Sequence, residues 1–277
     1  MKIIMTLLVR DEEDILKENI DFHLKQGIDF IIATDNCSTD STKEILKSYE
    51  KQGKLHYIYE PEDNYNQYKW VTKMAQLASS EYQADWIINN DADEFWWPRE
   101  HKNLKEAFKS LDVKYNIIEA QRTNFVPLEQ TYTKFYETMI YRELQSLNPL
   151  GKPLPPKQAH KALDNIIVHQ GNHSVDGFKK KYIKYDLIEI FHFPIRTKEQ
   201  LLNKIKKGGA AYERNTTLSK NIGNTWRSLY QQLRETGNLD HYLANNIYNA
   251  QKIEENIKNN ILTKDLRLKE YLSSIYE

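Results

Sequence analysis

Short apolar runs alternate with longer amphipathic segments through the first 120 residues, and this order limits the chain to few folds. The apolar runs predict strands over Lys2–Val9, Ile28–Thr34, Leu55–Tyr59 and Trp86–Ile88. Between them, apolar residues at helical spacing predict helices, the first of which spans Glu12–Gln26. Strands and helices that alternate in this way form a parallel sheet with helices on its faces. We therefore predict an α/β fold with a Rossmann-like, mostly parallel sheet.

Two acidic residues, Asp91 and Asp93, follow the fourth predicted strand. Side chains two positions apart in an extended chain lie on one side, so these carboxylates can converge on one point. Two carboxylates at a strand end suit Mg²⁺ or Mn²⁺, which takes its remaining ligands from water and from a substrate's phosphates. The alternative is a plain acidic turn. Ligands of open α/β sheets bind at the carboxyl ends of the strands, where the loops also carry Arg10–Glu12 and Asp35–Ser38.

Three segments, in this order and at this spacing, carry a resemblance to a known family. They are Leu7-Leu-Val-Arg-Asp-Glu-Glu-Asp-Ile-Leu, Thr34-Asp-Asn-Cys-Ser-Thr-Asp-Ser-Thr and Asp85-Trp-Ile-Ile-Asn-Asn-Asp-Ala-Asp-Glu-Phe. The chain resembles the family 2-like glycosyltransferases of the GT-A fold, whose nucleotide-sugar half carries such motifs. The resemblance covers residues 1 to 97 closely and the rest of the chain less closely.

The resemblance implies roles for the residues of these motifs. Arg10, Glu12 and Asp35 are expected to lie beside the nucleoside of the donor, and Lys73 is included among the nucleotide contacts. Asp91 and Asp93 are expected to hold a divalent ion that bridges the donor's diphosphate, so Asp91 belongs to both groups. The resemblance thus predicts an Asp-x-Asp, metal-dependent glycosyltransferase.

A strand that ends at His192 offers a third metal ligand. Alternation places His192 on the same face as Ile188 and Ile190, where a histidine is usually structural. The family tends to place a histidine here, however, and imidazole suits Mn²⁺ better than Mg²⁺. The amphipathic helix predicted after it carries cations that could reach the departing diphosphate, Arg196 and Lys204 among them. Gly208 and Gly209 would let this segment move as a lid.

The acceptor half of the chain is expected to supply a base. In the family, a carboxylate deprotonates the attacking hydroxyl, because inversion requires attack opposite the departing diphosphate. Asp176 is the candidate by its order in the chain, with His173 and Glu129 as alternatives. The alternative is that Asp176 has no catalytic role and only forms a hairpin turn with Gly177. The stretch Thr131–Tyr141 is predicted as a strand with alternating aromatic residues.

Charge and composition exclude several classes of protein. The chain has 39 basic and 39 acidic residues, so no overall attraction to nucleic acid is expected. The single cysteine, Cys37, excludes an internal disulfide and fits a reducing compartment. No apolar run reaches the about 20 residues that span a bilayer. We expect a cytoplasmic protein, with the lysines at 179–181 and 198–207 available for peripheral contact with anionic lipid at the inner face of a membrane.

These observations predict three segments and one reaction. Residues 1–100 form the nucleotide-sugar-binding half, residues 101–215 the acceptor-binding half and lid of the same domain, and residues 216–277 a helical C-terminal extension. The predicted reaction moves a sugar, most simply from a UDP-sugar, to a hydroxyl of a glycan or glycolipid in surface polysaccharide or lipooligosaccharide synthesis. The alternatives are a sugar nucleotidyltransferase, which would normally show a glycine-rich loop near the first strand, and a non-catalytic carbohydrate-binding protein.

Overall fold

The computed structural model describes residues 1–129, 134–147, 151–219 and 222–277, which divide into two units. The first unit comprises Met1–Pro61, Asn66–Arg122 and Leu154–His192. The second comprises Glu62–Tyr65, Thr123–Pro153 and Phe193–Glu277. The functional division predicted at residues 100 and 215 stays a prediction.

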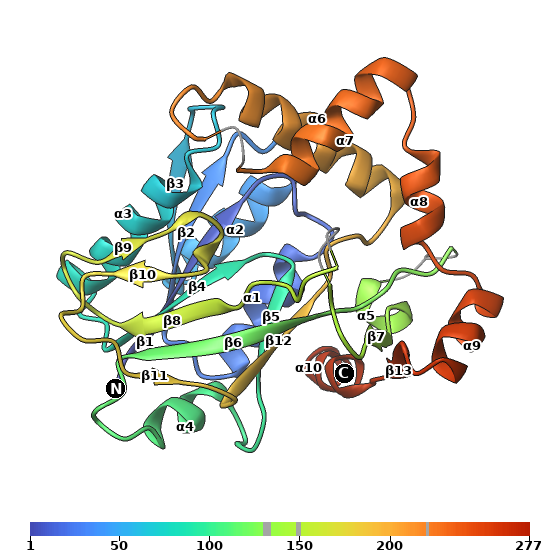
Figure 1. Ribbon diagram of the computed structural model, residues 1–277. Helices are drawn as coiled ribbons and strands as arrows, with labels where there is room; N and C mark the ends of the chain where they lie inside the picture. Colours follow the sequence, from blue (N-terminus) through green and yellow to red (C-terminus); the bar gives the residue numbers. More distant parts are fainter. Residues whose placement is uncertain (130–133, 148–150, 220–221) are drawn as a thin grey trace. The chain divides into compact units, whose positions relative to one another are not determined.

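A nine-stranded sheet organises the first unit (Figure 1). Its strands are β1 (Ile3–Val9), β2 (Phe30–Asn36), β3 (Leu55–Glu60), β4 (Trp86–Asp91), β5 (Glu94–Pro98), β6 (Ile117–Asn124), β8 (Lys157–Lys161), β11 (Ile183–Lys184) and β12 (Ile188–His192). Their order is β3-β2-β1-β4-β8-β6-β12-β5, with β11 paired to β6. The first four strands are parallel, whereas β8 runs antiparallel to β4 and β6, and β5 runs antiparallel to β12. The predicted α/β class with a mostly parallel sheet is confirmed.

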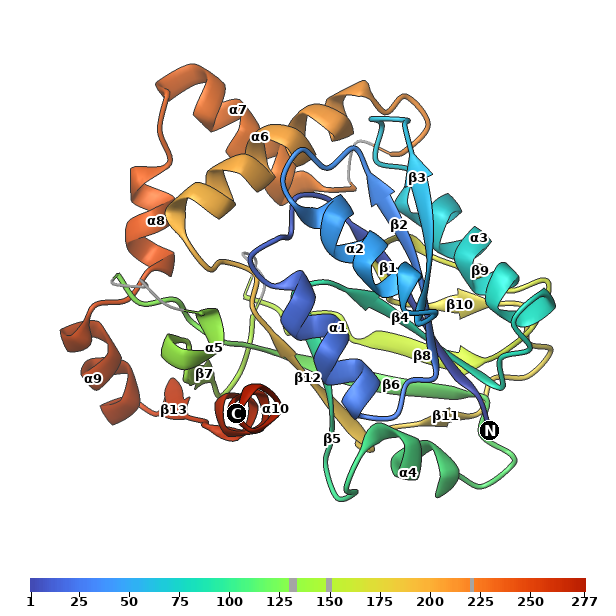
Figure 2. The ribbon, with the colours of Figure 1, turned by 180° about the vertical axis from the view of Figure 1, so that it is seen from behind.

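Helices cover both faces of this sheet. They are α1 (Leu16–Lys25), α2 (Thr42–Lys51), α3 (Gln67–Ser80) and α4 (Leu104–Lys109). Figures 1 and 2 show α1 and α2 on one face and α3 on the other. The strand order explains this placement, because right-handed crossovers from β1 to β2 to β3 move in one direction along the sheet and the crossover to β4 moves back. A two-stranded hairpin, β9 (Ile167–Val168) and β10 (Val175–Asp176), packs beside α3, and the short 3₁₀ helix η1 (Gln170–Asn172) connects its strands.

The core of the first unit lies between the parallel strands and α3. Ile4, Ile32 and Ile87 pack there against Val71 and Met74, and none of the five side chains is more than 1% exposed. Parallel strands covered on both faces are apolar along their whole length, which is why the sequence shows continuous apolar runs. The carboxyl ends of these strands carry the polar loops.

The first helix begins later than predicted. It starts at Leu16 rather than Glu12. The amides of the preceding residues bond to the loop after β2 and to the start of α2, since Asp11 donates to Ser38 Oγ at 3.0 Å and Glu12 to Thr42 Oγ1 at 2.9 Å. The Glu12 carbonyl accepts hydrogen bonds from the Ile15 and Leu16 amides, so only a single turn precedes the helix.

The strand predicted over Thr131–Tyr141 is wrong in its described part. Phe135–Thr138 forms a short helix, α5, and β7 (Tyr141–Glu143) begins only at the last predicted residue. Residues 130–133 lie outside the described residues. Phe135 is buried by packing against another aromatic side chain and not within a sheet. Its ring lies edge-on to Phe193, with 4.9 Å between the ring centroids.

The second unit is mainly helical, as predicted for the end of the chain. Its other elements are α6 (Lys198–Arg214), α7 (Asn224–Thr236), α8 (Asp240–Asn246), α9 (Ala250–Lys258), β13 (Leu262–Lys264) and α10 (Arg267–Tyr276). Thr197 caps α6 by accepting a hydrogen bond from the Gln200 amide at 3.0 Å. Leu201, Ile205 and Leu229 join α6 to α7 in a small apolar core.

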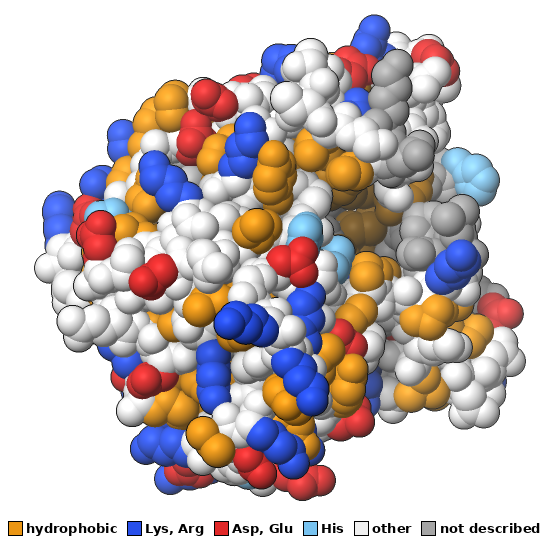
Figure 3. Space-filling model, turned by 60° about the vertical axis from the view of Figure 1, so that its left-hand side comes forward, with side chains coloured by type: hydrophobic (Ala, Val, Ile, Leu, Met, Phe, Trp, Pro, Cys, Tyr) orange, Lys and Arg blue, Asp and Glu red, His pale blue; other side chains and the backbone are white. Residues whose placement is uncertain are grey.

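The surface carries charges of both signs. On the face shown in Figure 3, basic and acidic side chains are interspersed with hydrophobic ones. Among the described residues, none of the helices combines the length and the apolar character needed to cross a bilayer. The mixture of charges agrees with the formal net charge of zero.

The two adjacent glycines of α6 serve close helix packing. A Cβ atom at Gly209 would lie 2.3 Å from Tyr230 Cβ on α7, and one at Gly208 would lie 3.3 Å from the Trp226 ring. Both glycines have helical neighbours on either side within α6. Their presence is therefore explained by the approach of α7.

We predict that Gly209→Ala destabilises the protein by about 1–3 kcal/mol, because the added methyl group forces Tyr230 or the helix away from its position. Gly208→Ala is the matched control, since it makes the same change one residue earlier and meets only the edge of Trp226. Urea denaturation of both variants measures the difference. Equal stabilities of the two variants would contradict the packing role of Gly209.

Candidate active site

The acidic turn joins two strands that lie far apart in the sheet. Asp91 ends β4 near the middle of the sheet, and Glu94 begins β5 at its far edge. Strand β12 runs antiparallel to β5 in a register that places His192 opposite Glu94. Residues directly opposite each other in an antiparallel pair project from the same face. The pairing of β5 with β12 therefore brings a histidine from late in the chain to the acidic turn.

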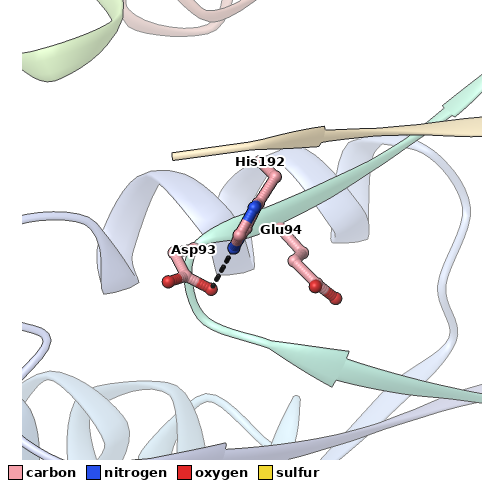
Figure 4. Close-up of side chains that lie close together, drawn as sticks. All are labelled: Asp93, Glu94 and His192. Atoms are coloured by element: carbon pink, nitrogen blue, oxygen red, sulfur yellow. Dashed lines mark ion pairs between the residues drawn. The ribbon is translucent and has the colours of Figure 1, made fainter. Parts of the chain in front are cut away.

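Asp93, Glu94 and His192 form a cluster that could hold a metal ion (Figure 4). One potential ligand atom from each lies within 4.8 Å of the other two, and His192 Nε2 is 3.8 Å from Asp93 Oδ1. Asp93 and Glu94 are buried, and the His192 side chain is 12% exposed. Carboxylate and imidazole are ligands that suit Mn²⁺.

The environment of Glu94 fits a cation. Its Oε1 lies 3.2 Å from Lys157 Nζ and 3.5 Å from Arg122 Nη1. Its Oε2 is buried and has no hydrogen-bond partner among the described residues. Burial raises the pKa of Glu94 to about 7, with Asp91 and Asp93 adding to the rise against Lys157 and Arg122. A divalent ion would satisfy the unpartnered oxygen and the excess of negative charge.

Asp91 lies outside this cluster. Its Oδ2 forms an ion pair with Lys157, and its Oδ1 accepts a hydrogen bond from Asn172 Nδ2 at 3.2 Å. The Lys157 side chain is 2% exposed and the Asp91 side chain 32%, so a buried lysine compensates the charge of a half-buried carboxylate. The structure thus brings together two of the three predicted ligands, Asp93 and His192, and adds Glu94. The ligand role of Asp91 stays a prediction.

The predicted nucleoside contacts lie at the carboxyl ends of β1 and β2. Asp35 pairs in register with Val9, the residue before Arg10. Asp35 is 1% exposed and accepts hydrogen bonds from the Ser38 amide at 3.0 Å and from the Tyr57 hydroxyl at 3.1 Å. Arg10 is half-buried, and Glu12 is 8% exposed beside the same loop. The sheet brings these three residues to one edge, and their contact with a nucleotide stays a prediction.

Three predicted nucleotide-binding cations lie on helices or helix ends. Lys73 is exposed on α3 and lines a shallow groove with Tyr68 and Ile167. In the second unit, Arg196 is 1% exposed and donates from Nη1 to the Phe193 carbonyl at 3.1 Å. Lys204 Nζ lies 5.7 Å from the centre of the Trp226 ring. Their role in binding a nucleotide stays a prediction.

The candidate bases have different surroundings. Asp176 is exposed on β10, where Lys181 Nζ at 2.8 Å and His169 Nε2 at 2.7 Å hold its carboxylate. These hydrogen bonds lower the pKa of Asp176, which makes it a weaker base. His173 is mostly buried, and burial together with Lys157 and Arg122 lowers its pKa to about 4. The imidazole is therefore neutral near pH 7, and because its Nδ1 donates to the Pro156 carbonyl at 2.8 Å, the lone pair is on Nε2. Glu129 is exposed in the second unit.

Several residues of this site were not predicted from the sequence. Lys157 follows a proline-rich stretch, and Arg122 and Asn172 lie in segments without a motif. Only Glu94 gave a signal, as the last acidic residue of the motif itself. A buried lysine that compensates acidic side chains depends on strand pairing, which a single sequence does not reveal.

We predict that Lys157→Met destabilises the protein by about 3–5 kcal/mol, because it removes the nearer of the two cations beside the fully buried Glu94 carboxylate and the ion-pair partner of Asp91. Adding Glu94→Gln should recover part of this loss. Lys161→Met on the same strand is the control, because its Nζ donates at the surface to the Val113 carbonyl and forms no ion pair within the described part of the chain. Urea denaturation gives all three values, and a Lys157 variant as stable as the Lys161 variant would contradict the compensation.

We also predict that stability falls as the pH is lowered from about 6.5 to 4. Burial lowers the pKa values of His23, His160 and His173 to about 4 from the ordinary value of 6.5, so the unfolded chain binds more protons in this window. Glu94 acts in the opposite direction. Because its pKa is raised to about 7 in the folded protein, the folded state binds one more proton there than the unfolded chain.

Comparison of His160→Gln with the wild type isolates one histidine. Between pH 4 and 6.5, the free energy of unfolding of the variant should change less steeply with pH than that of the wild type, by up to about 1.4 kcal/mol per pH unit. Urea denaturation at several pH values measures it, with exposed His241→Gln as the control. An unchanged slope for His160→Gln would contradict the prediction.

Comparison with known structures gives distant likenesses. TarS from S. aureus (residues 1–349) is 10% identical over 85% of this chain and 73% of that chain, with a TM-score of 0.44. Its complex with UDP-GlcNAc gives 11% identity over 83% and 72% of the two chains, with a TM-score of 0.43. HddC from Yersinia pseudotuberculosis is 10% identical over 70% of this chain and 95% of that chain, with a TM-score of 0.38. These values are too low to support an argument about function.

A search among curated proteins gave no match. The model of glycosyltransferase family 92 matches residues 5–236, which is most of the chain and includes every motif described above. The glycosyltransferase predicted from the sequence is therefore confirmed, although the matching family is 92 and the resemblance was to family 2. The chain belongs to glycosyltransferase family 92, and it is an enzyme of that kind.

Proposed function

We propose that this enzyme transfers a sugar from a nucleotide-sugar donor, a UDP-sugar, to a hydroxyl group of a glycan or glycolipid, with a divalent ion at Asp93, Glu94 and His192. The observation that carries the proposal is the cluster of these side chains beside the carboxyl ends of the parallel strands. Open α/β sheets bind their ligands there. Family membership supports sugar transfer over nucleotidyl transfer or carbohydrate binding alone.

The proposed ligand set differs from the sequence-based one in a single residue. Glu94 takes the place of Asp91, because Glu94 lies in the cluster with Asp93 and His192, whereas Asp91 lies outside it, paired with Lys157 and Asn172. When bound, Mn²⁺ or Mg²⁺ neutralises negative charge on the departing diphosphate. The imidazole of His192 favours Mn²⁺.

The charges of the site support an anionic ligand. Asp91, Asp93 and Glu94 supply three negative charges when ionised, and Lys157 and Arg122 supply two positive ones. The group therefore has a charge of −1 by itself and +1 with a divalent ion. A diphosphate would be attracted only to the second state. With or without the ion, the buried ammonium group of Lys157 reduces the repulsion between the Asp91 and Glu94 carboxylates.

The protein's own groups have further roles in the proposal. Arg10, Glu12 and Asp35 would bind the nucleoside, and their shared edge of the sheet supports this. A base would deprotonate the acceptor hydroxyl as its oxygen attacks the sugar carbon opposite the leaving diphosphate, which inverts that carbon. Asp176 was the first candidate for this base. It stays the candidate in this proposal, with His173 and Glu129 as the alternatives, since burial, Lys157 and Arg122 lower the pKa of His173 to about 4 and weaken that imidazole as a base.

The proposal also includes a cellular process and a location for the enzyme. Synthesis of surface polysaccharide or lipooligosaccharide would use such a transfer, and it would place the enzyme in the cytoplasm, with peripheral contact at the membrane where the acceptor is carried by lipid. The exposed lysines at 179–181 support that contact through charge.

We predict that Asp93→Asn lowers Mn²⁺-dependent release of UDP from a UDP-sugar by about 100-fold or more, because a neutral amide is a poor ligand for a hard cation. A panel of nucleotide sugars with wild-type enzyme first identifies the donor by thermal shift. Asp112→Asn, at an exposed surface carboxylate, is the matched control. Turnover of the Asp93 variant near the wild-type rate would reject the proposed metal site.

A further inference from the structure

Asn19 of α1 contacts the acidic turn from inside the protein. It is fully buried, and its Nδ2 donates hydrogen bonds to the Ala92 carbonyl at 2.9 Å and to the Glu94 carbonyl at 2.7 Å. These carbonyls lie on either side of Asp93. A single amide group therefore holds the backbone before and after one of the proposed metal ligands.

The amide of Asn19 is in turn held by a second asparagine. Asn90 Nδ2 donates to Asn19 Oδ1 at 3.1 Å, and the Trp96 indole Nε1 donates to Asn90 Oδ1 at 2.9 Å. All three side chains are at most 1% exposed. The chain of hydrogen bonds runs from β5 through β4 to α1 and back to the turn. It leaves the Asn19 amide one orientation, with its nitrogen toward the turn.

His23, one helical turn after Asn19, completes the network. Its Nδ1 lies 2.8 Å from the Asn19 carbonyl, and its Nε2 lies 3.4 Å from the Trp96 amide nitrogen. The first contact requires a proton on Nδ1 and the second requires a free Nε2, which is the neutral imidazole. Burial lowers the pKa of His23 to about 4, so this form is present at neutral pH. The backbones of α1 and β5 are thus joined beside the turn.

From these contacts we infer that Asn19 is a positioning residue, which orients the Asp93 and Glu94 carboxylates for binding of the divalent ion. The inference rests on the proposed function, because it concerns the same site. An amide is the side chain this place requires, since it donates twice to carbonyls and accepts once. Aspartate has the same shape but lacks both donors when ionised, and its charge would repel the two carbonyl oxygens. Groups behind metal ligands commonly determine ligand geometry in this way.

The test is the affinity of Asn19→Asp for Mn²⁺ alone, measured by electron paramagnetic resonance. We expect a dissociation constant about 10–100-fold higher than that of the wild type, the usual effect of losing an outer partner of a metal site. Asn19→Ser, which keeps one donor and adds no charge, should give a smaller increase. If Asn19→Asp does not fold, the Asn19→Ser variant provides the test of Mn²⁺ affinity instead.

Thr6→Val is the matched control for a general loss of stability. Thr6 Oγ1 donates to Asn89 Oδ1 at 2.9 Å, a buried hydrogen bond between β1 and β4 that does not touch the turn. Both Thr6→Val and the Asn19 variants should lower the Tm by about 2–8 °C. Only the Asn19 variants should bind Mn²⁺ more weakly.

The outcomes separate the two proposals. If folded Asn19 variants bind Mn²⁺ as the wild type does, or if Thr6→Val loses the same affinity, the positioning role is overturned and the proposed metal site stands. If the wild type itself binds no Mn²⁺, the metal site is rejected, and the positioning role with it. Weaker binding in the Asn19 variants alone supports both.

Discussion

The burial of carboxylates at the end of β4 is the constraint on which the rest of the site depends. Glu94 is fully buried with Asp93 and Asp91 beside it, and such charges are tolerated inside a protein only with nearby positive partners. Lys157 and Arg122 provide part of this compensation. The unpartnered Oε2 of Glu94 marks the part that remains. This imbalance supports the proposal that the site holds one more cation.

The sheet topology brings these charges together. Lys157 begins β8, which pairs with β4 on one side and β6 on the other, and Arg122 lies on β6. His192 arrives on β12, opposite Glu94. The acidic turn leaves the middle of the sheet and rejoins it at the edge, so that side chains from three other strands, β6, β8 and β12, lie around it. Asn19 fixes the turn from the helical side.

The sequence predicted the parallel half of the fold well, for a physical reason. Strands such as Ile3–Val9 are buried on both faces, so their local composition alone identifies them. The sequence predicted the short elements less well. It did not indicate the antiparallel strand Glu94–Pro98, and it predicted a strand where Phe135–Thr138 forms a helix. Their conformation depends on partners from distant segments, and local patterns of two to five residues do not specify those partners.

By itself, the sequence determined the α/β class, the place of the acidic turn and the candidate ligands Asp93 and His192, because motif order and apolar periodicity are local properties. The tertiary structure alone decided that Asp91 pairs with Lys157, that Glu94 joins the cluster and that Asn19 supports the turn. These outcomes depend on strand register and on hydrogen bonds between residues more than 60 positions apart. Such pairings are settled only when the whole sheet is assembled and its buried charges must be compensated together.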